Sequence, residues 1–299
     1  MNNDIRNLIS YVCQGNLKSA QMQAKNILEA DNTEKNKRFR EDMIHRLEMQ
    51  KGFENLPQNL KSLLVIEEPE NYPEGKFLLR DNEMTIAEKT LSTYRASSKL
   101  IELGIPYLPT LMLYGKSGCG KTELARYIAY KANLPFIYVR FSNLVTSYLG
   151  STQKNIASIF EYVRTTPCVL CFDEIDTIGM ARGQRDDVGE MNRVVIALMQ
   201  EMDRLPNNVI IIGTTNRFDR LDEALVRRFS LQYEVTPLSE AEGLALADRF
   251  FGYAGIKPSN LSEWYSDNID FFDIIPAHKI VKACTEYIVN EVLKEGNAE

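Results

Sequence analysis

The chain has 299 residues, of which 44% are hydrophobic, so it is long enough for one large domain with a helical appendage or for two domains. Its formal net charge of −6 gives no basic excess to neutralise phosphates, which weighs against nucleic acid as the main partner. No run approaches the ~20 apolar residues that span a bilayer, and the start MNNDIRNL lacks the layout of a signal peptide, so we expect a cytoplasmic protein without a membrane segment.

Residues 1–60 are predicted to form a small helical domain. Ile5, Ile9 and Val12 recur at helical spacing, and a second apolar-periodic stretch follows a break at Gly15. This pattern favours a helical hairpin at the start of the chain.

Residues 61–84 are predicted to be a linker, because they contain the sequence EEPENYPEG with two prolines. Thr85 with Glu88 three positions later matches a capping box. We therefore expect a helix from Thr85 to about Leu103.

Four short apolar runs, TLMLY, FIYVR, CVLCF and VIIIG, alternate with helical stretches between residues 85 and 237. Alternation of this kind predicts an α/β fold, with a parallel sheet and helices on both faces. Ligands in such sheets bind at the carboxyl ends of the strands. Functional residues are therefore expected directly after these four runs.

The first run is followed by GKSGCGKT and then by a helix beginning ELARYIAY. The form G-x-x-x-x-G-K-[ST] wraps backbone N–H groups around a phosphate, while its lysine reaches the terminal phosphates and its hydroxyl ligates Mg²⁺. A glycine-rich turn without a ligand is the alternative. The predicted nucleotide contacts are Gly115, Lys116, Ser117, Gly118, Cys119, Gly120, Lys121, Thr122 and Glu123.

The third run ends in the acidic pair Asp173-Glu174. Beside a phosphate loop, Asp173 would complete a Mg²⁺ site with Thr122, and Glu174 would orient and deprotonate an attacking water, which indicates hydrolysis. A solvated acidic turn is the alternative. Cys168 and Cys171 form a CxxC, but we interpret them as buried strand residues, and the five cysteines as reduced core thiols.

The fourth run leads into TTNRFDRLDEALVRRF. Asn216, just past the strand, is positioned to contact a γ-phosphate or the lytic water, with a turn or capping role as the alternative. Together GKSGCGKT, FDEID and GTTNRFDRLDEALVRRF resemble the AAA family of ATPases, over about Met84 to Leu293. The resemblance implies ATP and Mg²⁺ as cofactors, a parallel sheet of order 5-1-4-3-2, a helical lid at residues 238–299, and assembly into rings, usually hexamers.

The resemblance also implies roles for single residues. Asn216 would report the γ-phosphate, and Arg227 and Arg228 are candidate arginine fingers for the site of a neighbouring subunit, a contribution of ~10³ to 10⁵ in rate. The family usually spaces its fingers R-x-G-R, whereas these two arginines are adjacent, so both stay candidates. A surface cation pair at a helix end is the alternative for at least one of them.

Tyr148, Leu149 and Gly150 lie in a predicted loop, FSNLVTSYLGSTQK. The resemblance implies that this loop lines the central pore of a ring, where an aromatic residue grips an extended polypeptide through non-directional apolar contact. Packing of Tyr148 on its own domain is the alternative. Residues 182–190, RGQRDDVGE, are a second pore loop by the same resemblance, or simply a solvated charged loop.

In the predicted lid, Ser239 with Glu242 forms a capping box, and Pro276 opens a last helix. We expect His278 on the surface of that helix, with an approach to the phosphates as the alternative. Trp264 is expected to pack inside the lid.

We therefore expect an ATP-hydrolysing ring that remodels, unfolds or threads a protein, with residues 1–60 and the pore binding the substrate or an adaptor. Any effector, such as a protease, would be a separate chain, because no protease motif is apparent. The alternatives are a nucleic-acid helper ATPase, such as a helicase loader or transposition regulator, and an ATP-binding switch that signals by assembly. The acidic charge and the aromatic triplet weigh against the nucleic-acid alternative.

Overall fold

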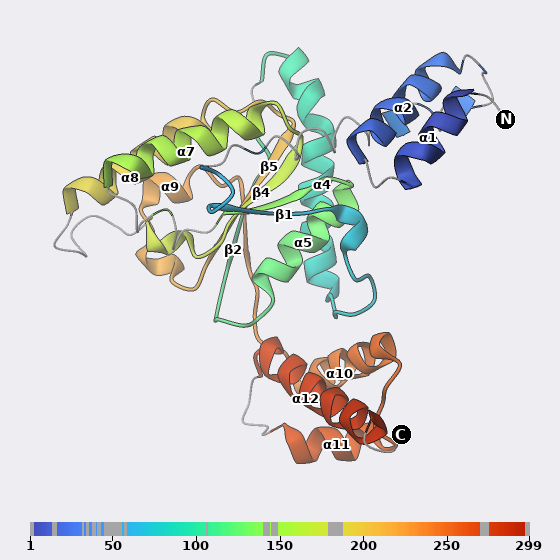
Figure 1. The fold of residues 1–299 in the computed structure, drawn as a ribbon. Helices are drawn as coiled ribbons and strands as arrows, with labels where there is room; N and C mark the ends of the chain where they lie inside the picture. Colours follow the sequence, from blue (N-terminus) through green and yellow to red (C-terminus); the bar gives the residue numbers. More distant parts are fainter. Residues whose placement is uncertain are drawn as a thin grey trace. The chain divides into compact units, whose positions relative to one another are not determined.

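The computed structural model describes residues 3–13, 17–31, 33, 36–37, 40, 43–44, 56, 59–105, 107–139, 144, 149–178, 188–269 and 275–296 (Figure 1). The chain divides into two compact units, Met1–Gln58 and Asn59–Glu299. Among the residues described, no helix is long and apolar enough to cross a bilayer.

The first unit contains two packed helices, α1 (Asn3–Cys13) and α2 (Leu17–Ala30). Ala20 is buried between them. The apolar face of α1 is only partly covered, since Ile5, Ile9 and Val12 stay 41%, 46% and 62% exposed. Apolar periodicity therefore identified the helix correctly, but it did not place these side chains in a core.

The second unit is built on one six-stranded sheet, so the predicted α/β class is confirmed. Its strand order is β1-β3-β4-β5-β2-β6, in which β1 is antiparallel and all other pairings are parallel. Counted in chain order, the parallel strands therefore read 5-1-4-3-2 across the sheet. The strands are β1 (Leu64–Glu67), β2 (Thr110–Tyr114), β3 (Phe136–Val139), β4 (Cys168–Phe172), β5 (Val209–Thr215) and β6 (Leu231–Glu234).

The central strands explain the continuous apolar runs in the sequence. Every residue of β4 and β5 is buried, because helices cover both faces of the parallel sheet. Cys168 and Cys171 are fully buried in β4, as expected of strand residues. Cys13 differs from the expected core thiols, because it lies exposed on α1.

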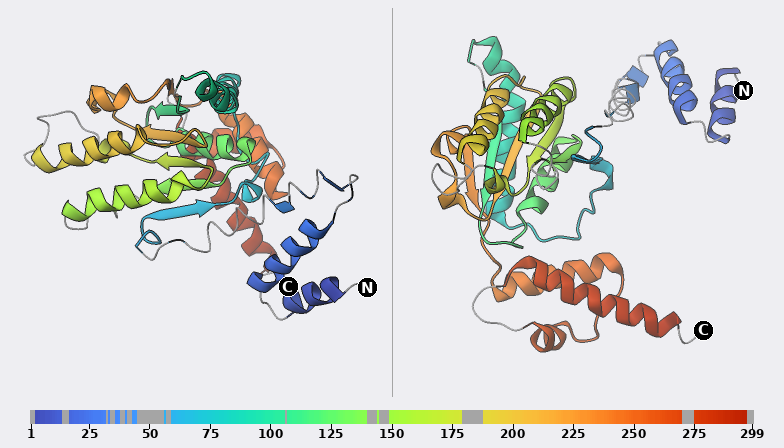
Figure 2. Two further views of the ribbon diagram at one scale, coloured as in Figure 1. Left: turned by 90° about the horizontal axis from the view of Figure 1, so that it is seen from above. Right: turned by 60° about the vertical axis from the view of Figure 1, so that its left-hand side comes forward.

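Four long helices cover the sheet. Figures 1 and 2 show α4 (Asp81–Glu102) and α5 (Lys121–Ala132) on one face, and α7 (Leu149–Arg164) and α8 (Val188–Met202) packed together on the other. The turns after the strands carry three short segments, η3 (Ile175–Thr177), η4 (Phe218–Arg220) and α9 (Glu223–Val226).

The predicted linker needs correction, since part of it belongs to the sheet. Residues 64–67 form β1, an edge strand that pairs with β3, and η2 (Pro69–Asn71) follows. The two prolines obscured a strand of only four residues, LVIE.

The predicted start of the helix at Thr85 is also wrong. The helix α4 begins four residues earlier, at Asp81, where a carboxylate oxygen of Glu83 accepts a hydrogen bond from the Arg80 backbone N–H at 2.9 Å. The Thr85 hydroxyl instead donates to the Asp81 carbonyl within the helix. The true capping acid was present in the sequence, but its partner is an arginine, which the usual pattern does not include.

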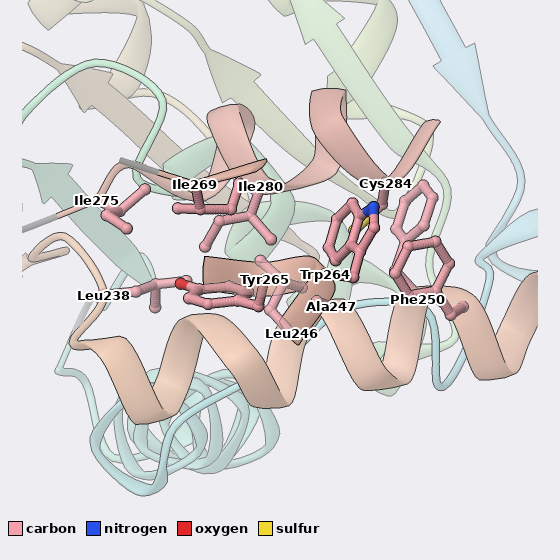
Figure 3. Close-up of a cluster of buried hydrophobic side chains, with 11 residues drawn as sticks. Leu238, Leu246, Ala247, Phe250, Trp264, Tyr265, Ile269, Ile275, Ile280 and Cys284 are labelled. Carbon is pink, nitrogen blue, oxygen red and sulfur yellow. The ribbon is translucent and has the colours of Figure 1, made fainter. Parts of the chain in front are cut away.

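The C-terminal part of the second unit is a helical subdomain with its own core, at the position of the predicted lid, and it is called the lid below. It consists of α10 (Glu240–Ala254), α11 (Leu261–Asn268) and α12 (Ala277–Gly296), and α10 begins at the predicted Ser239–Glu242 capping box. Trp264 packs in this core as predicted, with its ring edge-on to Phe251 at 4.8 Å between centroids. Figure 3 shows these apolar side chains gathered between the three helices.

Candidate active site

The glycine-rich loop between β2 and α5 forms one wall of a cavity of about 360 Å³. Gly118 has φ +77°, a conformation that favours glycine, and a β-carbon there would lie 1.9 Å from Nδ1 of His278. The backbone therefore needs a glycine at this position for two reasons. The loop ends at the N-terminus of α5, where free N–H groups and the helix dipole favour an anion.

Lys121 is the buried cation of this cavity, with only 7% of its surface exposed. Its ammonium donates to the Gly115 and Lys116 carbonyls at 3.0 and 2.9 Å, and to Oδ1 of Asn216 at 2.6 Å. Burial lowers the pKa of Lys121, while nearby acidic groups including Asp173 oppose that shift. The structure thus brings together the predicted phosphate-loop lysine and the asparagine that follows β5.

Asp173 lies at the end of β4, opposite the first turn of α5. Its Oδ1 accepts a hydrogen bond from the Thr122 hydroxyl at 2.9 Å and another from the hydroxyl of Thr214. Its Oδ2 accepts one from the Tyr138 hydroxyl at 2.9 Å. A threonine hydroxyl and a carboxylate at this distance are the hard oxygen ligands that suit Mg²⁺.

Glu174 follows in a strained conformation, with φ +52° in the left-handed region. Non-glycine residues adopt this region at a cost of ~1–2 kcal/mol. The Glu174 backbone N–H donates to Thr214 Oγ1 at 3.1 Å, which helps to hold the turn, and its exposed side chain lines the cavity. Glu174 is therefore free to contact a molecule bound beside the phosphate loop.

The lid closes the other side of the cavity. The His278 backbone N–H, in the first turn of α12, donates to the Gly118 carbonyl at 3.1 Å, and its side chain lines the cavity. His278 is exposed, as expected of a residue on the helix surface, and its side chain also lies against the glycine-rich loop. Periodicity could not reveal this contact, because it joins residues 160 positions apart through tertiary packing.

Glu123 also lines the cavity, at the start of α5. Burial raises the pKa of its carboxyl, although the nearby Arg126 guanidinium lowers it, with Nη1 3.7 Å from Oε2. Among the described residues, Oε1 of Glu123 has no hydrogen-bond partner. The Arg126 guanidinium also donates two hydrogen bonds to the carboxylate of Glu67 in β1, from Nε at 2.7 Å and from Nη2 at 3.1 Å.

Arg227 and Arg228 do not join this cavity. They line a different one, at the end of α9. The Arg227 side chain is 76% exposed, and its one ion pair among the described residues is with Glu223, which is 88% exposed, at 3.1 Å. Arg228 is 34% exposed and donates to the Ala224 carbonyl at 3.1 Å and to Asp203 at 3.3 Å. The two adjacent arginines are therefore not equivalent.

The predicted pore segment is only partly described. Tyr148 lies outside the described residues, as do residues 179–187 of the second predicted loop. Leu149 and Gly150 form the first turn of α7, so the expectation of a loop is wrong at these two positions.

Several residues of the site were not predicted from the sequence, and three of them make informative contacts. Thr214 and Tyr138 bind Asp173, and Leu78, which precedes α4, lines the cavity and packs against the lid core. The threonine pair after VIIIG was a usable signal, because polar residues at the end of a buried strand face a ligand edge. Tyr138 could be found only from the register of β3 with β4.

Comparison with known proteins shows which family this part of the chain resembles. Residues 111–237 match the family described as "ATPase family associated with various cellular activities (AAA)". The peroxisomal ATPase pex6 of Schizosaccharomyces pombe is 38% identical over 149 residues, which are 48% of this chain and 16% of that protein. The peroxisomal ATPases PEX6 of Arabidopsis thaliana and Dictyostelium discoideum are 40% and 42% identical, each over 43% of this chain and 14% and 11% of theirs.

Residues 111–237 are thus similar to the AAA family of ATPases, and this similarity supports ATP hydrolysis by this part of the chain. The match spans less than a fifth of the length of these relatives. The similarity therefore concerns the ATPase domain and not the whole of those proteins.

Proposed function

We propose that this chain is a subunit of a cytoplasmic AAA ring, a hexamer by family resemblance, that uses ATP hydrolysis to remodel, unfold or thread a protein. The observation that carries the proposal is the placement of Arg227. It is a highly exposed guanidinium at the C-terminal end of α9, outside the cavity that holds Lys121 and Asp173. A cation placed in this way is accessible to the active site of another subunit.

We assign the phosphates of ATP to the loop from Gly115 to Glu123, with Lys121 on the terminal phosphates and Asn216 beside the γ-phosphate. Phosphate oxygens would replace the carbonyl and amide acceptors that the Lys121 ammonium contacts. Thr122 and Asp173 would hold Mg²⁺, which neutralises negative charge on the phosphates when bound.

Glu174 is proposed as the general base. It follows Asp173 directly, its side chain is exposed, and it lines the same cavity as the phosphate loop. A carboxylate there orients a water molecule and accepts its proton as the water attacks the γ-phosphate. The left-handed backbone at Glu174 lies in the turn that follows β4.

Of the two arginines, we propose Arg227 as the arginine finger that reaches the active site of the neighbouring subunit. Its exposed pair with Glu223 contributes little energy, so it can exchange that carboxylate for a phosphate of the next subunit. Arg228 is held by two partners of its own domain and would keep α9 in place. This assignment makes hydrolysis dependent on assembly.

The protein substrate is proposed from the sequence Tyr148-Leu149-Gly150 and from the family resemblance, with residues 1–60 as the site that recruits the substrate or its adaptor. The exposed apolar residues of α1 support a binding role for the N-terminal unit. A separately encoded effector would act on the remodelled protein. The acidic net charge of −6 supports protein over nucleic acid as the substrate.

The test compares ATP hydrolysis with an unfolded, casein-like protein and with single-stranded DNA. We expect the unfolded protein to stimulate hydrolysis. Tyr148→Ala should lose this stimulation, while Tyr148→Phe keeps an apolar ring and should retain it. Stimulation by single-stranded DNA alone would favour a nucleic-acid helper ATPase, and stimulation by neither would favour a switch that signals by assembly.

A further inference from the structure

Tyr138 is a residue of β3 whose hydroxyl reaches the acidic turn after β4. The register explains this reach, because Tyr138 lies opposite Cys171 in the parallel pair and Asp173 follows two residues later. Residues two apart along a strand point to the same face, and an aromatic side chain spans the diagonal to such a neighbour. The Tyr138 hydroxyl accordingly lies 2.9 Å from Oδ2 of Asp173.

The two oxygens of Asp173 have different environments. Oδ1 faces the start of α5 and accepts hydrogen bonds from Thr122 and Thr214. Oδ2 faces the neighbouring strand and accepts the hydrogen bond from Tyr138. A carboxylate without the last contact could rotate about its terminal bond, because that torsion is broad. The tyrosine therefore fixes the torsion angle of the carboxylate, so that one oxygen stays directed at Thr122.

We propose that Tyr138 is a positioning residue for Mg²⁺: its hydroxyl orients the Asp173 carboxylate so that Oδ1 and the Thr122 hydroxyl converge on the ion. The proposal rests on the role proposed above for Asp173 in holding Mg²⁺. Groups that hydrogen-bond a metal-binding carboxylate typically change metal affinity by ~10- to 100-fold when they are removed.

The chemistry of Tyr138 suits this task at neutral pH. A tyrosine hydroxyl is an O–H donor, and here it donates to Oδ2 of the Asp173 carboxylate at 2.9 Å. Phenylalanine preserves the ring and removes only this donor, so Tyr138→Phe isolates the contact.

The experiment measures binding of a fluorescent ADP analogue to the full chain as the Mg²⁺ concentration is raised, at a temperature below the melting transition of every variant. For Tyr138→Phe we expect the half-saturating Mg²⁺ concentration to rise about tenfold, with affinity in the absence of Mg²⁺ unchanged. A purely structural role would lower the melting temperature and leave the Mg²⁺ dependence as in the wild type.

Two further variants make the result decisive. Tyr130→Phe removes a similar bond, from the Tyr130 hydroxyl to Glu74 at 2.5 Å on the outside of α5, and should leave the Mg²⁺ dependence unchanged. Asp173→Asn tests the underlying assignment and should raise the Mg²⁺ requirement further than Tyr138→Phe. If Asp173→Asn matches the wild type, the magnesium site is wrongly assigned and the inference fails with it. If Asp173→Asn raises the requirement but Tyr138→Phe does not, only the role of Tyr138 is overturned.

Discussion

The cations on the two sides of the ATPase domain differ sharply in burial. Lys121 is 7% exposed and has three acceptors within its own chain. The side chain of Arg227 is 76% exposed, and among the described residues it forms one ion pair, with the exposed Glu223. A buried cation with several acceptors is fixed in place by the fold, whereas an exposed one is held weakly and can change partners. We infer from this difference that Lys121 belongs to a site completed within the chain, whereas Arg227 is available for a contact outside it.

The strongest test of this comparison is Arg227→Ala. Because a finger acts in the transition state, we expect turnover to fall by about 10³ or more while ADP affinity and melting temperature stay near wild type. Arg228→Ala should instead lower the melting temperature, since that side chain binds Ala224 and Asp203 of its own domain. Steady-state hydrolysis and thermal melting of both variants measure the difference.

Mixing experiments sharpen the same point. A preparation of Arg227→Ala mixed with Lys121→Ala should regain some activity, because an intact arginine can then meet an intact phosphate loop at mixed interfaces. Specific activity of the wild type should also rise with protein concentration. Full turnover in a strictly monomeric wild-type sample would contradict a role for Arg227 in trans.

A second prediction concerns the acidic pair of the same cavity. Glu174→Gln should reduce turnover by ~10² to 10⁴ while ATP still binds, because Asp173 and Thr122 remain to hold Mg²⁺. Trapped ATP, measured by filter binding, distinguishes this variant from Lys121→Ala, which should lose nucleotide binding. Turnover at the wild-type rate would show that Glu174 is not the base.

A third prediction tests the contact between the phosphate loop and the lid. Gly118→Ala should lower nucleotide affinity by roughly tenfold, because its left-handed backbone alone costs ~1–2 kcal/mol and its β-carbon would meet His278. Gly75→Ala is the matched control, since Gly75 also has positive φ, +90°, but a β-carbon there meets nothing within 4 Å. The control should lose stability without losing affinity. Equal effects of both variants on affinity would exclude a role for the lid contact.

The parts of the site that are local in sequence could be predicted, and the parts set by packing could not. The phosphate loop and the Asp173-Glu174 pair are contiguous motifs placed after strands, so pattern and topology sufficed. The contacts of Tyr138 with Asp173 and of His278 with Gly118 depend on strand register and on docking of the lid. The unequal arginines could not be separated either, because exposure of adjacent residues depends on their neighbours in space.

The same limit applies to the fold. Alternating apolar runs predicted the α/β class and the parallel strands, because each run is long enough to be buried on both faces. The edge strand β1 was missed, since its pairing partner β3, and not its own composition, makes it a strand. The start of α4 was misplaced because Arg80 and Glu83 replace the usual serine or threonine pattern.

The smallest expected effects are changes in melting temperature at two acidic residues, one partly buried and one exposed. Burial raises the pKa of Glu123, whose ordinary value is 4.5, so its charged form is disfavoured in the folded state. The stability that the neutral carboxyl contributes is then fully present at pH values below the unfolded-state pKa of Glu123. It is lost as the pH rises through the folded-state pKa. Glu123→Gln mimics the neutral form, and Arg126 keeps its two bonds to Glu67. The variant should therefore melt slightly above the wild type at pH 7, and the difference should shrink as pH falls below about 4.5.

Glu74 provides the opposite case on the exposed side of α5. Hydrogen bonds from Tyr130 and Lys131 lower the pKa of Glu74. The stability that the charged carboxylate contributes is therefore present at pH values above its unfolded-state pKa, and it is lost as the pH falls through its folded-state pKa. Glu74→Gln should consequently melt at or slightly below the wild type at pH 7 and match it in acid. Melting curves of both variants across pH 3 to 8 measure two small differences of opposite sign. A Glu123→Gln variant that melts below the wild type at every pH would mean that Arg126 outweighs burial, and that the carboxyl beside the phosphate loop stabilises the fold as a charge.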